Sequence, residues 1–232
     1  MRHATLLISF SGLDGSGKST QIENLRDLLA RLGYTTNLRA FWDHVVVLSR
    51  YREGFVHKAY GSERGIGAPG KPVARRDKNV RRWYLTLLRH MLYVLDAIHL
   101  RSVVEQARRD CDVLIVDRYI YDELANLPLR NPLTRAYVRF VNRLAPQPDI
   151  AYLLDADPDA AVARKPEYPV EFMHRCRAAY YELARQLGTL TIVPPLPLPE
   201  AKQAVTDVFM MKLASELRAQ RSRAAAADME AA

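Results

Sequence analysis

The chain has 232 residues, 49% hydrophobic and 26% charged, with a net charge of +8 at pH 7, and this composition fits one globular domain with a full core. No apolar run has the length of a membrane span, and two cysteines (Cys111 and Cys176) are too few for a disulfide framework and lack metal-ligand spacing. The N-terminus leads directly into an apolar run, so we expect no secretory signal and a cytoplasmic location.

The first expected element is a buried strand over residues 4–10, and a glycine-rich turn follows it. Residues 12–19 read Gly-Leu-Asp-Gly-Ser-Gly-Lys-Ser and satisfy the phosphate-loop pattern GxxxxGK[ST]. A helix is expected over residues 21–31. A strand, a glycine turn and a helix start place backbone N–H groups and the positive helix end around one anion. The motif predicts a nucleoside triphosphate site; the alternative is an ordinary strand–helix turn.

Each residue type in this loop has an expected role. The ammonium of Lys18 reaches the terminal phosphates, and the hydroxyl of Ser19 ligates Mg²⁺. The residues expected to bind ATP are Gly12, Asp14, Gly15, Ser16, Gly17, Lys18, Ser19 and Thr20.

A second strand is expected over residues 35–41, and a strongly basic segment comes after it. Residues 50–82 hold ten Lys or Arg residues against three acidic ones, a balance of +7. The segment is also rich in glycine and proline, which suits a long irregular loop. We call residues 43–80 the basic insertion. It is either a solvated surface or a flap that faces phosphates; a nucleic-acid contact is less favoured because no binding motif is present.

The rest of the chain alternates between helices and strands. Helices are expected over residues 81–109, 132–144, 157–164, 171–187 and 198–219, and strands over residues 112–117, 150–154 and 189–193. In the first of these helices one apolar stripe is formed by Tyr84, Leu87, Leu88, Met91, Leu95 and Ile98. The alternation predicts an α/β fold of three layers, a parallel five-stranded sheet with helices on both faces. We expect one domain over residues 1–215 and a frayed Ala-rich tail over residues 216–232.

Two residues at the end of the third expected strand point to phosphate chemistry. Asp117 follows an apolar run, at a position from which a carboxylate could hold Mg²⁺ through water; it could instead cap a turn. Arg118 comes next, and its planar guanidinium could grip two phosphate oxygens and neutralise charge in the transition state.

A further segment has the order of a lid that closes over a nucleotide. A strand over residues 150–154 leads into a helix, then into a short connection with Arg164 and Lys165, and then into a helix with Arg175 and Arg177. We define residues 164–171 as the lid.

These segments together resemble the thymidylate kinase family of nucleoside monophosphate kinases, over roughly residues 4–195. The matching segments are the phosphate loop, Asp117-Arg118-Tyr119, residues 152–158, and a helix with Phe172, Arg175, Arg177 and Tyr180. The resemblance implies a P-loop kinase fold, transfer of the γ-phosphoryl group of ATP to a nucleoside monophosphate, Mg²⁺ as cofactor and dTMP as the favoured acceptor. It also implies a homodimer.

The resemblance assigns roles to residues as well. Lys18 and Arg118 would be catalytic, together with Arg164 and Lys165, which stand where bacterial members of the family carry lid arginines. Arg39 matches the arginine that holds the acceptor phosphate. The residues expected at the acceptor site are Arg39, Arg89, Tyr93, Arg118 and Tyr119.

The departures from the family lie on the acceptor side. Where the family has Glu-Pro-Gly-Gly-Thr, this chain has Ala-Phe-Trp-Asp-His over residues 40–44. Tyr93 matches the family aromatic that stacks on thymine, but Ala97 stands where an arginine reads the base edge. Arg89 and Arg101 share the i, i+4 lane of Tyr93 and could substitute, while Tyr93 itself could be a core residue.

Two other functions therefore stay open. The first is a P-loop kinase acting on another phosphorylated acceptor, such as another nucleotide, polyphosphate or a metabolite. The second is a nucleotide-dependent protein that binds nucleic acid or regulates a partner.

Overall fold

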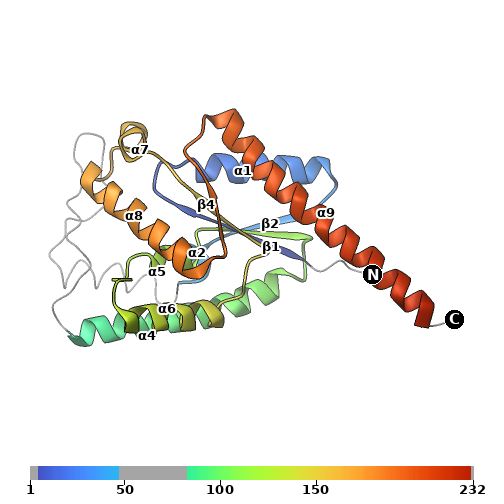
Figure 1. The fold of residues 1–232 in the computed structure, drawn as a ribbon, viewed down its shortest axis with the longest axis horizontal. Helices are drawn as coiled ribbons and strands as arrows, with labels where there is room; N and C mark the ends of the chain where they lie inside the picture. The colour runs from blue at the N-terminus through green and yellow to red at the C-terminus, as the bar shows by residue number, and fades with distance from the viewer. Residues whose placement is uncertain (1–4, 47–82, 231–232) are drawn as a thin grey trace.

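A parallel sheet forms the centre of the computed structural model, which describes residues 5–46 and 83–230 (Figure 1). Its five strands lie in the order β2-β3-β1-β4-β5. They are β1 (Leu6–Gly12), β2 (Thr36–Ala40), β3 (Val113–Asp117), β4 (Ile150–Leu154) and β5 (Leu190–Val193). All five expected strands are confirmed. Almost the whole basic insertion lies outside the described residues.

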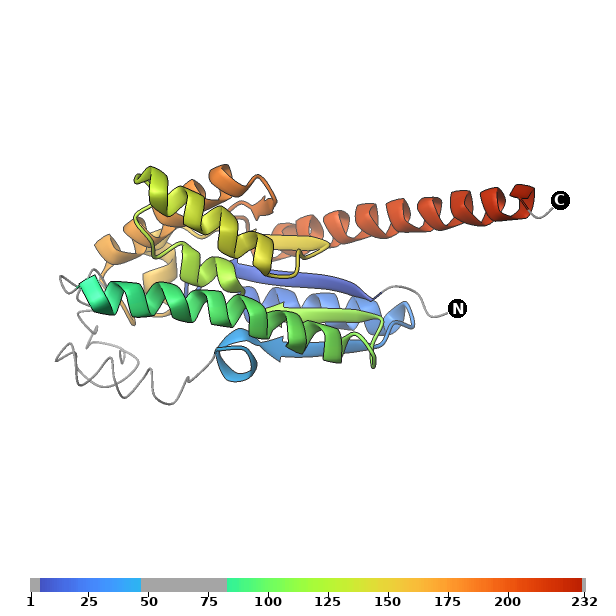
Figure 2. The same ribbon diagram turned by 90° about the horizontal axis from the view of Figure 1, so that it is seen from below.

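Helices cover both faces of this sheet, as the alternating pattern predicts. They are α1 (Lys18–Arg31), α2 (Phe41–His44), α4 (Trp83–Ala107), α5 (Ile120–Leu124), α6 (Pro132–Leu144), α7 (Pro158–Arg164), α8 (Val170–Leu187) and α9 (Leu198–Glu230). Figure 2 shows α4 and α6 along one face and α1 on the other. The three-layer α/β fold is confirmed.

Side-chain alternation along the strands produces two cores. On β1, Leu7 packs into the core under α4, α5, α6 and α8, whereas Ile8 and Phe10 pack into the core under α1 and α9. Strand residues that alternate in this way, with both sets apolar, are typical of a sheet that is buried on both faces.

The register of the strands brings three segments together at one edge. Phe10 of β1 pairs with Asp117 of β3, and Gly12 of β1 pairs with Leu154 of β4. The turn after β1, the end of β3 and the end of β4 therefore meet at the carboxyl edge of the sheet, which is where open α/β folds bind ligands.

One apolar stripe of α4 does not face the core. Leu87, Leu88, Met91, Leu95 and Ile98 are all between 44% and 56% exposed, while the buried face of the helix carries Tyr93, Ala97, Leu100 and Val104. The helix is apolar on two sides, so its periodicity alone could not tell which side packs on the sheet.

The ends of some helices differ from the expected ones, and two short helices were not expected. α2 and α5 have five residues or fewer, too few to leave a periodic pattern. α9 continues to Glu230 through the tail that we expected to be frayed, because alanine, arginine and glutamate all favour the helix. No helix within the described ranges has the length and apolar character needed to cross a bilayer.

Candidate active site

The phosphate loop between β1 and α1 is held tightly against neighbouring backbone. A Cβ at Gly12 would lie 2.2 Å from the carbonyl oxygen of Leu154, and one at Gly15 would lie 2.9 Å from that of Ala161. Both glycines also have positive φ angles, 140° and 80°. Because no other residue fits these two positions, the glycines of the motif are required by packing as well as by conformation.

The loop ends directly in the first turn of α1. Gly17, in the left-handed region, is the N-cap residue, and no side chain caps the helix. The N–H groups of a first helical turn have no partner within the helix. They and the positive end of the helix dipole therefore offer a site for an anion, with the exposed residues Ser19 and Thr20 beside it.

Lys18 lies folded back under the loop. Its Nζ donates to the carbonyl oxygens of Gly12 at 3.1 Å and Leu13 at 2.7 Å, which leaves one of its three donors for a ligand. Burial, and after it the charge of Arg118, lower the pKa of Lys18 to about 8, against the opposing effect of nearby carboxylates.

Asp117 lies at the end of β3, beside the loop. Its Oδ1 atom is buried and has no hydrogen-bond partner among the described residues. Burial raises the pKa of Asp117, although Lys18 and Arg118 oppose this. A carboxylate oxygen that no described residue donates to suits a hard cation such as Mg²⁺. No cluster of three or more metal-ligating side chains occurs in the described ranges, and Mg²⁺ held mainly by phosphates needs none.

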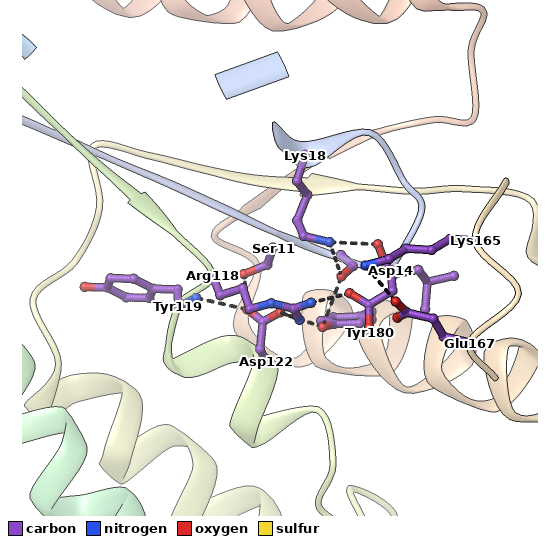
Figure 3. A network of polar contacts seen from close by, with 11 residues as sticks. Ser11, Asp14, Lys18, Arg118, Tyr119, Asp122, Lys165, Glu167 and Tyr180 are labelled. Atoms are coloured by element: carbon purple, nitrogen blue, oxygen red, sulfur yellow. Dashed lines mark hydrogen bonds and ion pairs between the residues drawn. The ribbon is translucent and has the colours of Figure 1, made fainter. Parts of the chain in front are cut away.

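Arg118 leaves the strand with an unusual backbone. Its φ angle is 65°, and its N–H donates to the carbonyl oxygen of Phe10 at 2.8 Å. Its guanidinium lies between two carboxylates: Nη2 pairs with Asp14 of the phosphate loop, and Nη1 lies 3.4 Å from Asp122 (Figure 3). Burial alone would lower the pKa of Arg118, but Asp122 and Asp14 outweigh it and raise the pKa.

Asp122 is a site residue that the sequence analysis missed. Besides Arg118, it accepts hydrogen bonds from Ser11, Tyr180 and the backbone N–H of Tyr119. It lies on α5, at the third position after the N-cap residue Tyr119. An acidic residue three positions into a helix is a known capping signal, and this was the only trace of Asp122 in the sequence.

The two lid cations, Arg164 and Lys165, have different neighbours. Lys165 pairs with Glu167 at 3.2 Å, and it is one of the charges that lower the pKa of Asp14, after Arg118 and Lys18. Arg164, the last residue of α7, lines a cavity of about 370 Å³. Ser16 of the phosphate loop and residues 193–197 after β5 line the same cavity.

Two of the residues expected at the acceptor site, Tyr119 and Tyr93, are buried in the core. Tyr119 is fully buried and donates to the carbonyl oxygen of Pro146, so its side chain does not reach the loop. Tyr93 is 2% exposed within the core under α4, as its core alternative predicts.

The two arginines expected at the acceptor site, Arg39 and Arg89, come from different elements, β2 and α4. Arg39 is on the edge strand β2, in register with Val116, and its Nε is buried without a hydrogen-bond partner among the described residues. Arg89 is half-buried on α4 near Tyr137, whose pKa it lowers against the larger effect of burial. α4 leads into the start of β3 and runs back along the sheet (Figure 2). By chain order, Arg89 is therefore in the half of α4 nearer the carboxyl edge, and the exposed Arg101 is in the other half.

Comparisons with known proteins agree with the geometry of the loop. The chain is 30% identical over 190 residues to the probable thymidylate kinase of Pyrobaculum aerophilum, a match that covers 78% of this chain and 84% of that protein. It is 28% identical over 199 residues to the thymidylate kinase of Ruegeria pomeroyi, covering 78% and 82% of the two chains. No family model matches the chain.

A solved structure gives the same result for the fold. The crystal structure of thymidylate kinase from Ehrlichia chaffeensis aligns with a TM-score of 0.57 at 17% identity, over 90% of this chain and 99% of that chain. Sequence matches across most of both chains, together with a phosphate loop, Asp117 and Arg118 at one edge of the sheet, lead to one conclusion: the chain belongs to the thymidylate kinase family and is a nucleoside monophosphate kinase.

Proposed function

We propose that the enzyme transfers the γ-phosphoryl group of ATP to dTMP with the help of Mg²⁺. The observation that carries this proposal is the convergence of Lys18 and Arg118 on the phosphate loop, at the carboxyl edge of a parallel sheet. Phosphoryl transfer needs mainly positioned substrates and neutralised charge, and these two cations supply the charge. The names of the relatives support dTMP as the acceptor.

ATP would be held at both of its ends. The loop from Gly12 to Thr20 would bind the phosphates through backbone N–H groups and Lys18. The cavity of about 370 Å³ next to Ser16 has room for the base, between Arg164 and the prolines after β5. Mg²⁺ would be held by Ser19 and Asp117, and when bound it would supply charge neutralisation for the phosphates.

The chain's own cations would act on the transferred group. Lys18 has one free donor for the terminal phosphates, and Arg118 would exchange its contact with Asp14 for phosphoryl oxygens. Arg164 and Lys165 would add charge when the lid over residues 164–171 closes. In this proposal the kinase domain spans residues 1–215.

The acceptor would bind between β2 and the N-terminal half of α4, which is the half nearer the carboxyl edge of the sheet. The Nε of Arg39 has no hydrogen-bond partner among the described residues, and this supports its role as the ligand of the acceptor phosphate. Arg89 is favoured over Arg101 as the group that reads the base, because it lies in the half of α4 nearer the carboxyl edge of the sheet. The burial of Tyr93 favours a second candidate, a kinase of the same mechanism whose acceptor is not thymidylate.

We further propose a homodimer that forms through the exposed apolar face of α4. Five large apolar side chains on one helix face, each about half exposed, form an apolar patch of the kind that marks a protein–protein interface. Leu95→Glu should convert the dimer to a monomer in sedimentation experiments, whereas the same change at the exposed Leu133 of α6 should not. We expect the enzyme in the cytoplasm, with a small nucleotide as partner and no nucleic acid.

The function is tested by measuring phosphoryl transfer from ATP across a panel of acceptors. We expect the largest kcat/KM with dTMP and dependence on Mg²⁺. A preference for another nucleoside monophosphate or for polyphosphate would replace dTMP and keep the chemistry. Failure with every acceptor, combined with tight and salt-sensitive retention on DNA, would contradict the kinase proposal and favour the nucleic-acid alternative.

A further inference from the structure

Asp122 is a buried carboxylate whose two oxygens are both occupied by donors. Oδ2 accepts from the Ser11 hydroxyl at 2.6 Å and from the backbone N–H of Tyr119 at 3.0 Å. Oδ1 accepts from the Tyr180 hydroxyl at 2.7 Å and lies 3.4 Å from Nη1 of Arg118. The residue is 5% exposed. A carboxylate buried so deeply is stable in its charged form only when donors and an opposite charge replace its water.

These donors fix the carboxylate from three directions. Ser11 comes from β1, Tyr119 begins α5, and Tyr180 comes from the middle of α8 (Figure 3). The position of Asp122 is therefore set by packed elements and does not depend on Arg118. Burial raises the pKa of the Tyr180 hydroxyl, as does Asp122, so this hydroxyl stays a donor across the physiological range.

Arg118 needs such an anchor because its own side chain is long and free to rotate. About a quarter of that side chain is exposed, and its backbone is held at a φ angle of 65°. Its two terminal nitrogens meet different partners. Nη1 faces the fixed and buried Asp122, whereas Nη2 faces Asp14, whose side chain is 25% exposed on the phosphate loop.

We propose that Asp122 is the positioning residue of Arg118: it holds one edge of the guanidinium so that the opposite edge faces the phosphate loop, where phosphoryl oxygens replace the carboxylate of Asp14. Ser11 and Tyr180 in turn hold Asp122. The inference rests on the proposed phosphoryl transfer and assigns to Asp122 a role in the orientation of Arg118. The alternative is that Asp122 serves only to tie α5 and α8 to the sheet.

Asp122→Asn tests the proposal with little change in shape. The amide oxygen can still accept from Ser11 and from the N–H of Tyr119, but the amide NH₂ cannot accept from Arg118. We expect kcat to fall ~10- to 100-fold, while the KM for ATP stays within ~twofold because the loop holds the nucleotide. The matched control is Tyr181→Phe, the next residue on α8, which removes a neutral hydroxyl donor from a different carboxylate, Asp155; kcat should stay within ~threefold of wild type.

A double-mutant cycle separates orientation from general stability. We would combine Asp122→Asn with Arg118→Ala and measure kcat for all four proteins. If Asp122 acts through Arg118, its substitution should change kcat less than ~twofold once Arg118 is gone. An equal fold loss in both backgrounds would overturn the proposal, because it would mean that Asp122 acts on the site by another route.

A second measurement keeps Asp122 in place and so covers the case in which its variant does not fold. Nitrogen NMR of the ligand-free Asp14→Ala variant should show slow rotation of the Arg118 guanidinium about its Cζ–Nε bond, because Asp122 still holds one edge after the contact with Asp14 is removed. Fast rotation would overturn the positioning role even if the kinase is active. An inactive wild-type enzyme would contradict the proposed function instead, and the rotation rate would still decide whether Asp122 fixes Arg118.

Discussion

The donor side of the site is formed mainly by backbone, whereas the expected acceptor side is formed by side chains. On the donor side, backbone sets the geometry: two glycines lie against the carbonyl oxygens of β4 and α7, and the helix α1 begins directly after the loop. On the acceptor side, the expected groups are long side chains on an edge strand and on α4. A site made of backbone is defined before ligands bind, whereas a site made of side chains has to be assembled around its ligand.

The most severe test of this comparison is Lys18→Ala on the donor side. We expect kcat/KM to fall at least ~1,000-fold, because the only loop side chain aimed at the terminal phosphates is lost. The melting temperature should not fall, since burial disfavours the charged form of this lysine and its removal relieves that burden. A purified variant that kept a tenth of wild-type turnover would break the assignment of the loop.

Arg118→Lys tests the second cation on the same side. Lysine keeps the charge but loses the planar fork that contacts Asp14, Asp122 and, in our proposal, the phosphoryl oxygens. We expect a fall of ~100-fold that appears mainly in kcat, by comparison with other phosphoryl clamps. Steady-state kinetics with both substrates measure this, and Arg31→Lys at the far end of α1 is the matched control. Normal kcat would leave Arg118 as a structural residue.

On the acceptor side the expected effects are smaller and selective. Arg89→Ala should raise the KM of the acceptor ~10-fold and leave the KM for ATP unchanged, which is typical of a lost charged contact in binding. Arg101→Ala, on the same helix but toward the other edge of the sheet, is the matched control and should have no effect. Equal effects of the two substitutions would mean that α4 does not read the acceptor.

The dependence on pH should also differ between the two sides. In the free enzyme the pKa of Lys18 is about 8, so its charge is present below that pH and is lost as the pH rises through it. The kcat/KM for ATP should therefore fall above about pH 8, while kcat should hold to higher pH because bound phosphates favour the charged lysine. The acceptor's KM should change less over this range. A flat kcat/KM profile to pH 9.5 would contradict the geometry of Lys18.

The sequence signals for the fold and for the phosphate loop are local. The phosphate-loop pattern, the apolar run before Asp117 and the periodic helices each depend on neighbouring residues, and all five strands and the fold class are confirmed. The role of the exposed stripe on α4 could not be read, because both sides of that helix are apolar. Asp122 was missed because its partners come from β1 and α8, far away in the chain, and no local pattern records such contacts.

The closeness of Gly15 to α7 has a mechanical consequence. The carbonyl oxygen of Ala161 lies 2.9 Å from the place that a Cβ at Gly15 would take, and Arg164 ends the same short helix three residues later. The helix that leads into the lid, α7, therefore lies in direct backbone contact with the phosphate loop. If the loop backbone shifts when a nucleotide binds, α7 would shift with it, because no side chain lies between the two backbones at this contact. Gly15→Ala would place a methyl group against Ala161 and should displace α7 with no nucleotide present.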